Sequence, residues 1–205
     1  FFVFDTAGRH RSTLNALTGS EIYTFNYNST GLLSGIKDAF NNVTRIERDE
    51  QGNPTAIIAP GGQWTGLAVD EKGNLSKIIC PLLKEKVLTY DEGGLLKSFS
   101  DHKGNQSIFT YDELGRLTKD AGPAGGYTEL SREELPNGHE VSVRTAEGSV
   151  SKYRMEYLGT GGVRRVNTDP LGGLTITEFL PDSTPIVTYP DGTIMTSVQG
   201  PDPRP

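Results

Sequence analysis

The stretch TYDELGRLTKDAGPAGG (Thr110–Gly126) decides the fold, because it repeats the pattern of TYDEGGLLKSFSDHKGN (Thr89–Asn105) 21 residues upstream. Both stretches spell Tyr-Asp-x-x-Gly-x-Leu. The Asp side chain can accept hydrogen bonds from backbone N–H groups two or three residues on, and the Gly adopts a positive φ without strain at Cβ. The flanks are rich in Thr, Tyr, Phe, Ile and Leu, as β-strands are. Each stretch therefore predicts a β-hairpin.

The pattern continues upstream with a constant period of 21 residues. Its turn glycines are Gly31, Gly52, Gly73, Gly94 and Gly115, and the residues three positions earlier are Asn28, Asp49, Asp70, Asp91 and Asp112. Apolar columns keep the same phase, for example Phe25, Ile46, Leu67, Leu88 and Phe109. A fixed period of this length is typical of a repeat architecture. We interpret the Asp and Gly columns as structural turn residues.

A second turn closes each unit at the opposite end of the hairpin. Gly62, Gly104 and Gly125 share the 21-residue phase, while position 41 holds Asn, which tolerates the left-handed conformation, and position 83 holds Leu. Each repeat therefore predicts two strands and two turns. Nine to ten such units predict a meander of about 18–20 strands.

The rhythm changes after about residue 127. Turn glycines Gly115, Gly138 and Gly161 are now spaced by 23 residues, and the Tyr-Asp pair disappears. We predict regular repeats over residues 1–127 and irregular hairpin repeats over residues 128–205 that continue the same sheet. Twisted open sheets rarely exceed about ten strands without curling or splitting. The chain could therefore form a sandwich or barrel, or a single curved layer. Strands with few large aliphatic residues, such as VTRIERD and SVSKYRMEY, favour a single layer with at least one wet face.

Composition limits the functions to consider. The chain has 205 residues, 34% of them hydrophobic, and a formal charge of −6, which is no footprint for nucleic-acid binding. Cys80 is the single cysteine, so no internal disulfide or Cys-based metal site is expected. No apolar run is long enough to span a membrane as a helix. The opening FFVFDTAGRH lacks the features of a signal peptide, and we interpret the chain as an excerpt of a longer polypeptide.

The stretches YDELGRLTKDAGPAGG, YDEGGLLKSFSDHKGN and RDEQGNPTAIIAPGGQ resemble the YD repeats of bacterial Rhs proteins. FDTAGRHRSTLNALTGSEIYTFNYNSTGLL is similar to the same family, whose repeat also occurs in the C components of insecticidal Tc toxins and in animal teneurins. The closing GPDPRP resembles Rhs proteins rather than teneurins. The resemblance covers nearly the whole chain and is most specific over residues 1–127.

The resemblance implies a function that composition does not show. YD repeats of this family wind a β-sheet ribbon into a hollow shell around a cytotoxic C-terminal domain. The expected partner is thus the C-terminal toxin domain of the same polypeptide, with secretion-spike proteins as further candidates. The resemblance also implies delivery out of a bacterium, often by a type VI secretion machine. No cofactor, nucleic acid or membrane span is expected.

No residue pattern predicts catalysis. TDPLGGL (168–174) is similar to the autoprocessing region of Rhs proteins, but no companion segment precedes it, so we interpret Asp169 and Gly172 as an ordinary turn. His10, His102 and His139 lie in separate turns without the partners of a catalytic triad or zinc site. DEQGN, DEKGN and DHKGN lack the ligand set of a calcium loop. The sequence predicts neither a catalytic residue nor a metal ligand.

One aromatic column precedes the turns: Tyr27, Tyr90 and Tyr111, interrupted by Arg48 and Val69. We interpret these tyrosines as structural, because aromatic side chains can pair across neighbouring strands. A sugar-binding stripe is the alternative. Three hypotheses follow: a segment of a toxin-enclosing shell, a cell-surface carbohydrate- or protein-binding module, and a protein that cleaves itself near Asp169. We favour the first.

Overall fold

The computed structural model describes residues 1–181, 184–198 and 200. These residues contain nineteen β-strands and no helix. The first ten strands are β1 (Phe2–Phe4), β2 (His10–Leu14), β3 (Glu21–Tyr27), β4 (Leu33–Asp38), β5 (Val43–Arg48), β6 (Pro54–Ile58), β7 (Trp64–Val69), β8 (Leu75–Cys80), β9 (Lys84–Tyr90) and β10 (Leu96–Ser100). The remaining nine are β11 (Gln106–Tyr111), β12 (Leu117–Ala121), β13 (Tyr127–Leu135), β14 (Gly138–Thr145), β15 (Val150–Tyr157), β16 (Val163–Thr168), β17 (Leu174–Phe179), β18 (Pro185–Thr188) and β19 (Ile194–Thr196).

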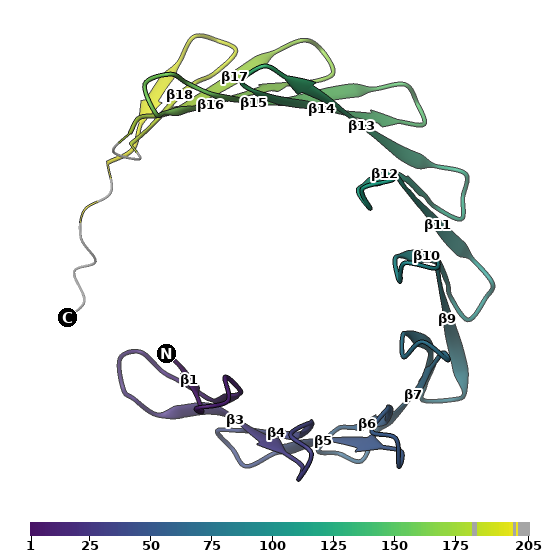
Figure 1. Cartoon of the computed structure of the whole chain (residues 1–205). Helices are drawn as coiled ribbons and strands as arrows, with labels where there is room; N and C mark the ends of the chain where they lie inside the picture. The colour runs from purple at the N-terminus through teal and green to yellow at the C-terminus, as the bar shows by residue number, and fades with distance from the viewer. Residues whose placement is uncertain (182–183, 199, 201–205) are drawn as a thin grey trace. The chain divides into compact units, whose positions relative to one another are not determined.

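The chain divides into two compact units, residues 1–106 and residues 107–205. In the first unit every strand from β1 to β10 pairs antiparallel with the next one along the chain. In the second unit the same holds from β11 to β19. Each unit is thus a meander of one layer, in which consecutive strands follow one another side by side (Figure 1). The prediction of an all-β fold built from repeated antiparallel hairpins is confirmed.

Large apolar side chains share one face of the first unit. Residues directly opposite in a strand pair lie on the same face, and the pairs are Phe25–Ile36, Ile46–Ile57, Leu67–Ile78 and Leu88–Phe99. We call the face formed by these eight residues the apolar face. All eight remain at least partly exposed, since no second layer covers them.

The opposite face of the first unit carries small residues, among them Gly35, Ala56, Gly66 and Ser98, which are buried. Ala56, at 1% exposure, is the one buried hydrophobic side chain in the described part of the chain. The ring of Trp64 lies over Gly66, where a Cβ would collide with it. Neither face therefore contributes to a dry core of the kind that a sandwich or barrel needs.

Each hairpin of the regular repeats contains a β-bulge that the sequence did not reveal. In β3–β4 the pairing passes from Tyr27–Leu33 to Asn26–Gly35 and skips Ser34. The same shift recurs in the hairpins β1–β2, β5–β6, β7–β8, β9–β10 and β11–β12. From β12–β13 onward the register shows no shift. Because a bulge bends its strand and increases its twist, the regular hairpins differ in shape from the later ones. The division at residue 127 stays a prediction.

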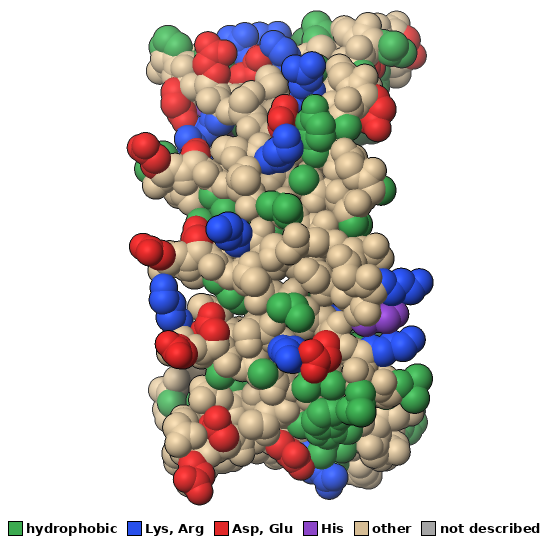
Figure 2. All heavy atoms as spheres, turned by 90° about the vertical axis from the view of Figure 1, so that its right-hand side faces the viewer, with side chains coloured by type: hydrophobic (Ala, Val, Ile, Leu, Met, Phe, Trp, Pro, Cys, Tyr) green, Lys and Arg blue, Asp and Glu red, His purple; other side chains and the backbone are tan. Residues whose placement is uncertain are grey.

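Charged side chains are numerous on both units. Figure 2 shows a face with small hydrophobic groups among polar ones and one larger hydrophobic patch toward the lower right, while acidic side chains project along the left rim. In the second unit, Glu156 is only 12% exposed and lies 2.6 Å from Arg154 and 3.7 Å from Arg164. Arg164 in turn lies 3.4 Å from Glu178 on the next strand. These ion pairs join β15, β16 and β17 where a core-facing sheet would carry aliphatic contacts.

Candidate functional site

The Asp and Gly columns form the turn at one end of each hairpin. In the turn of Asp49, the carbonyl of Asp49 accepts from the N–H of Gly52 at 3.0 Å, and its N–H donates to the carbonyl of Asn53 at 3.0 Å. Gly52 has a φ of 88°, which gives the hairpin loop with a left-handed bulge residue. Asp70, Asp91 and Asp112 form the same two bonds, each accepting from the glycine three residues on and donating to the carbonyl of the residue four positions on. The glycines Gly73, Gly94 and Gly115 have φ values of 84°, 84° and 75°.

The Asp carboxylates complete these turns. The N–H groups of Asn53, Asn74, Leu95 and Arg116 donate to the carboxylates of Asp49, Asp70, Asp91 and Asp112 at 2.8–2.9 Å. The side-chain amide and the backbone N–H of Asn74 hold the pKa of Asp70 below its ordinary value of 3.8. The backbone and guanidinium N–H groups of Arg116 lower the pKa of Asp112 in the same way. These contributions to stability are present at neutral pH and are lost as the pH falls through the lowered pKa.

The second turns meet the same backbone requirement with different residues. Gly62, Gly104 and Gly125 have φ values of 83–84°, and Asn41 takes the same region at 65°. At the tip between β8 and β9 the residues are Leu82 and Leu83, with φ values of 75° and 56°. A non-glycine residue in this region carries local strain.

Gly138 corrects one detail of the sequence interpretation. It begins β14 instead of occupying a left-handed turn position, and the loop before it consists of Pro136 and Asn137. A Cβ at Gly138 would collide with the backbone carbonyl of Met155 on β15. The glycine allows a close approach of two strands, and its spacing from Gly115 does not mark a turn of the same type.

Three residues of the Tyr column join their hairpin to the preceding one by a hydrogen bond. The hydroxyl of Tyr27 donates to the carbonyl of His10 at 2.8 Å, and the hydroxyl of Tyr90 donates to the carbonyl of Leu75 at 2.9 Å. Arg48, in the same column, donates through Nη2 to the carbonyl of Leu33 at 3.1 Å. We call these bonds clasps. Tyr111 lies at the equivalent position, at the end of β11 and opposite Leu117.

The clasps act where the backbone ladder between hairpins ends. Between β4 and β5 the pairing covers only Gly35–Arg45, Ile36–Thr44 and Lys37–Val43. Leu33 therefore has no ladder partner on β5, and Arg48 supplies the donor for its carbonyl instead. The sequence showed that Tyr and Arg share this column. Both residues have long side chains that can donate, which is a signal for a hydrogen bond, so the interpretation of the column as aromatic pairing misses this role.

Two positions of the column make no clasp. Val69 has no donor on its side chain. Position 132, which follows Tyr111 by 21 residues, holds an arginine, and its Nε and Nη2 donate to the carboxylate of Glu134 at 2.6 and 3.3 Å. Glu134 also lies 3.5 Å from the guanidinium of Arg116.

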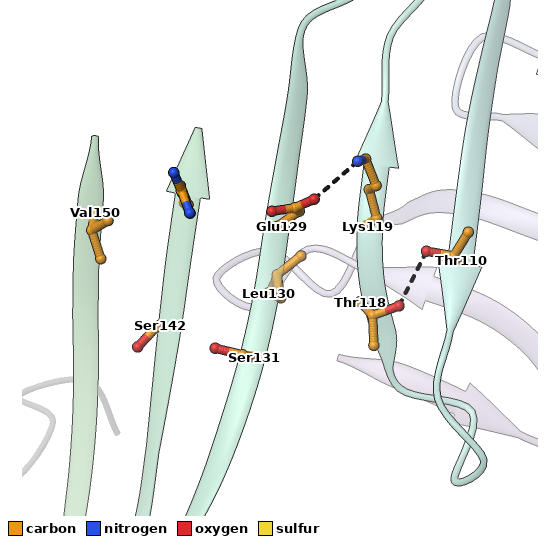
Figure 3. A pocket seen from close by; sticks show the side chains of 9 residues that line it. Thr110, Thr118, Lys119, Glu129, Leu130, Ser131, Ser142 and Val150 are labelled. Atoms are coloured by element: carbon orange, nitrogen blue, oxygen red, sulfur yellow. Dashed lines mark hydrogen bonds and ion pairs between the residues drawn. The ribbon is translucent and has the colours of Figure 1, made fainter. Parts of the chain in front are cut away.

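A hollow of about 500 Å³ lies beside this second exception, on one face of the sheet. Hydroxyl groups from four strands line it, and Lys119 and Glu129 form an ion pair of 2.9 Å at its edge (Figure 3). The hydroxyl-bearing residues are Thr110, Thr118, Ser131 and Ser142. A second hollow, of about 380 Å³, shares three lining residues with the first, Thr118, Leu130 and Ser131. Its other lining residues are Asp112, Arg116, Leu117, Arg132 and Val141. Since Val141 and Ser142 are neighbours on β14, their side chains point to opposite faces. The two hollows thus lie on opposite sides of one gap between β12 and β13.

The other residues singled out in the sequence remain apart from this gap. His10 and His139 lie in the strands β2 and β14 and not in turns, so that part of the sequence interpretation was wrong. The ring of His10 packs against Phe2, Phe4 and Phe25, with centroids 4.2–5.5 Å away. Asp169 accepts from the N–H groups of Leu171 and Gly173 at 2.8 and 2.9 Å, as the other turn Asp residues do. Within the described ranges, no group of three or more His, Cys, Asp or Glu side chains is placed to hold a metal ion. No helix of those residues could cross a membrane.

Comparison with known proteins places these features in a family. The family model described as "Teneurin YD-shell" matches residues 1–192. Human teneurin-1 is 40% identical over 62 residues, and mouse teneurin-4 is 36% identical over 62 residues. Each match covers 30% of this chain but only 2% of the relative, so the chain spans a small part of the length of these proteins.

Solved structures of toxin complexes are also similar. The Tc holotoxin pore of Photorhabdus luminescens matches 92% of this chain and 14% of its own, with 13% identity and a TM-score of 0.43. TcdB2–TccC3 without its hypervariable C-terminal region matches 97% of this chain and 16% of its own, with 12% identity and a TM-score of 0.44. The family model matches almost the whole chain, over the hairpins that carry the Asp-Gly turns and the clasps, and the chain therefore belongs to the teneurin YD-shell family.

Proposed function

We propose that the chain is a wall segment of a YD shell that encloses a C-terminal effector domain of the same polypeptide until delivery to a target cell. The observation that carries this proposal is the single-layer architecture. Each unit leaves both faces of its sheet at least partly exposed, with Ala56 as the one buried apolar side chain among the described residues. A sheet that separates two aqueous spaces needs no dry core, whereas a free-standing β domain does.

The same observations support a structural role without chemistry of its own. The repeated Asp carboxylates bind backbone groups of the turns, and the hydroxyls of Tyr27 and Tyr90 form clasps. We therefore assign these columns a structural role and not a catalytic one. The partner is the enclosed effector domain. By resemblance to the Rhs family, we also propose secretion-spike proteins as partners and export from a bacterium by a type VI secretion machine. Residues 128–205 would continue the wall that residues 1–127 build.

Protease protection of the effector domain tests the shell. The full-length parent protein is treated with trypsin, and the C-terminal domain expressed alone serves as the matched control. We expect the domain to remain uncut within the parent at a trypsin concentration that degrades the isolated domain. Equal cleavage rates in the two samples would exclude an enclosing wall.

A carbohydrate-binding stripe is less well supported. A sugar-binding tyrosine offers its ring face and hydroxyl to the ligand, but the hydroxyls of Tyr27 and Tyr90 already donate to backbone carbonyls. A glycan array distinguishes the two roles. Binding that is lost in both Tyr90→Ala and Tyr111→Ala, with the fold retained, would favour the binding module over the wall.

A further inference from the structure

The β12–β13 junction has a ladder of three pairs, as the β4–β5 junction does, but Arg132 forms no clasp beside it. Its ladder consists of Ala121–Tyr127, Asp120–Thr128 and Lys119–Glu129, although β13 continues to Leu135. The carbonyl of Tyr127 accepts from the N–H of Ala146, on the side of β14. Because backbone groups alternate in direction along a strand, the N–H and carbonyl groups of Leu130 then point toward β12. They meet the gap between the two hollows and not a ladder partner.

The carbonyl of Leu117 points toward the same gap. The carbonyl of Arg116 accepts from the N–H of Asp112 within the hairpin, so the next carbonyl, that of Leu117, points away from β11 and toward β13. Leu117 lies directly opposite Tyr111, as Leu33 lies opposite Tyr27. It therefore corresponds to the residue whose carbonyl receives a clasp in the earlier repeats.

Arg132 has the position and the chemistry to form that clasp. It follows Arg48 by four periods of 21 residues, and Arg48 shows that a guanidinium in this column can reach the carbonyl 15 residues earlier. For Arg132 that carbonyl is the one of Leu117. In this structure the guanidinium is instead directed to Glu134, at 2.6 Å from Nε.

We propose that the β12–β13 junction is a gated opening in the sheet, which closes when Arg132 leaves Glu134 and donates to the carbonyl of Leu117. Glu134 is 64% exposed, and ion pairs at such positions are weak enough to exchange partners. The carboxylate keeps a partner after the exchange, because Arg116 already lies 3.5 Å from it. Closure would bring β12 toward β13. The sheet would then be continuous at this junction, and the hollows on its two faces would be filled.

The exchange of Arg132 from Glu134 to the carbonyl of Leu117 is a property of this chain alone. That the open junction lets water and small solutes pass between the two faces of the sheet rests on the proposed wall. Exchange of the Leu130 amide hydrogen with solvent reports the state of the junction in the isolated 205-residue chain. The measurement needs no cargo domain, so its outcome is independent of the protease-protection test.

Three variants test the gate by residue-resolved NMR amide exchange. Arg132→Tyr installs the side chain with which Tyr90 forms its clasp, Arg132→Leu removes the donors, and Glu134→Gln weakens the competing pair. We expect the Leu130 amide to exchange about tenfold more slowly in Arg132→Tyr than in Arg132→Leu, as one added hydrogen bond predicts. Wild type should lie near Arg132→Leu, and Glu134→Gln between wild type and Arg132→Tyr.

The amide of Val143 faces β15, away from the junction, and is the internal reference for global stability. It should exchange at the same rate in all four proteins. Equal Leu130 rates in Arg132→Tyr and Arg132→Leu would overturn the clasp at this junction. A wild-type rate as slow as that of Arg132→Tyr would overturn the open resting state. A Glu134→Gln rate equal to that of wild type would show that Glu134 does not hold the gate.

Discussion

Tyr90→Phe tests whether the clasps hold neighbouring hairpins together. The hydroxyl of Tyr90 donates to the carbonyl of Leu75 at 2.9 Å and so joins the hairpin β9–β10 to the hairpin β7–β8. The substitution removes one oxygen atom and keeps the ring, which is half-buried on the apolar face. Any loss of stability is therefore assignable to the hydrogen bond and not to packing.

The expected loss is about 1 kcal/mol, within the range of about 0.5–1.5 kcal/mol for one intramolecular hydrogen bond. It stays below the cost of a fully orphaned buried group, because Leu75 is only partly buried and water can reach its carbonyl in the variant. In a chain of this size, 1 kcal/mol corresponds to a decrease in Tm of about 2–4 °C. Because repeat arrays are stabilised by their nearest-neighbour interfaces, the loss should be concentrated at the β8–β9 junction.

Urea unfolding followed by circular dichroism measures the free energy, and amide exchange at β8 and β9 locates the change. Tyr23→Phe is the matched control, since Tyr23 is 46% exposed and its hydroxyl makes no hydrogen bond in the described part of the chain. The control should change the unfolding free energy by less than about 0.5 kcal/mol. If Tyr90→Phe lost no more stability than Tyr23→Phe, the clasp would not be a stabilising contact.

Three further predictions concern the turns and the missing clasp. Leu83→Gly should raise the free energy of unfolding in urea by about 1 kcal/mol, because it relieves a φ of 56° at an 80% exposed side chain. Leu114→Gly, at a similarly exposed turn position without a positive φ, should lower it. Equal effects of the two substitutions would show that Leu83 is not strained. Asp70→Asn keeps an acceptor oxygen, as Asn28 does, but removes a group that titrates with a lowered pKa. Between about pH 6 and pH 3, wild type should therefore lose more stability than Asp70→Asn, and parallel losses would contradict this account. Val69→Tyr should add a clasp at the unclasped junction and raise the unfolding free energy by about 0.5–1 kcal/mol over Val69→Phe.

The turn chemistry of the regular repeats was predictable from the sequence because it depends on local interactions. An Asp accepts from N–H groups of its own turn, and a Gly three residues later supplies the positive φ, so both are readable within a few letters. Asn41 in a left-handed position followed from the same argument. Gly138 escaped it, because its requirement comes from the backbone of Met155 on another strand.

The clasps and bulges depend on contacts between strands, which the period alone does not specify. The Tyr column was visible as letters, but the choice between ring pairing and a hydrogen bond depended on where the carbonyl of Leu75 lies relative to Tyr90. The skipped residues are polar and most of them keep the 21-residue period, but a polar residue beside a turn does not by itself indicate a bulge. They are Arg11, Ser34, Thr55, Ser76, Lys97 and Thr118. Register is set by the pairing of whole strands, and it therefore appears only in the tertiary structure.

The sequence by itself determined that this protein is a long antiparallel meander, because turn residues at a fixed period leave the chain no other way to satisfy its backbone. It also indicated a wet face, since too few aliphatic side chains were present for a core. Only the tertiary structure decided which junctions carry a clasp. Arg48 and Arg132 occupy the same column, yet one donates to a neighbouring carbonyl and the other to Glu134. That difference arises from the partners within reach of each guanidinium in space, which one-dimensional spacing cannot specify.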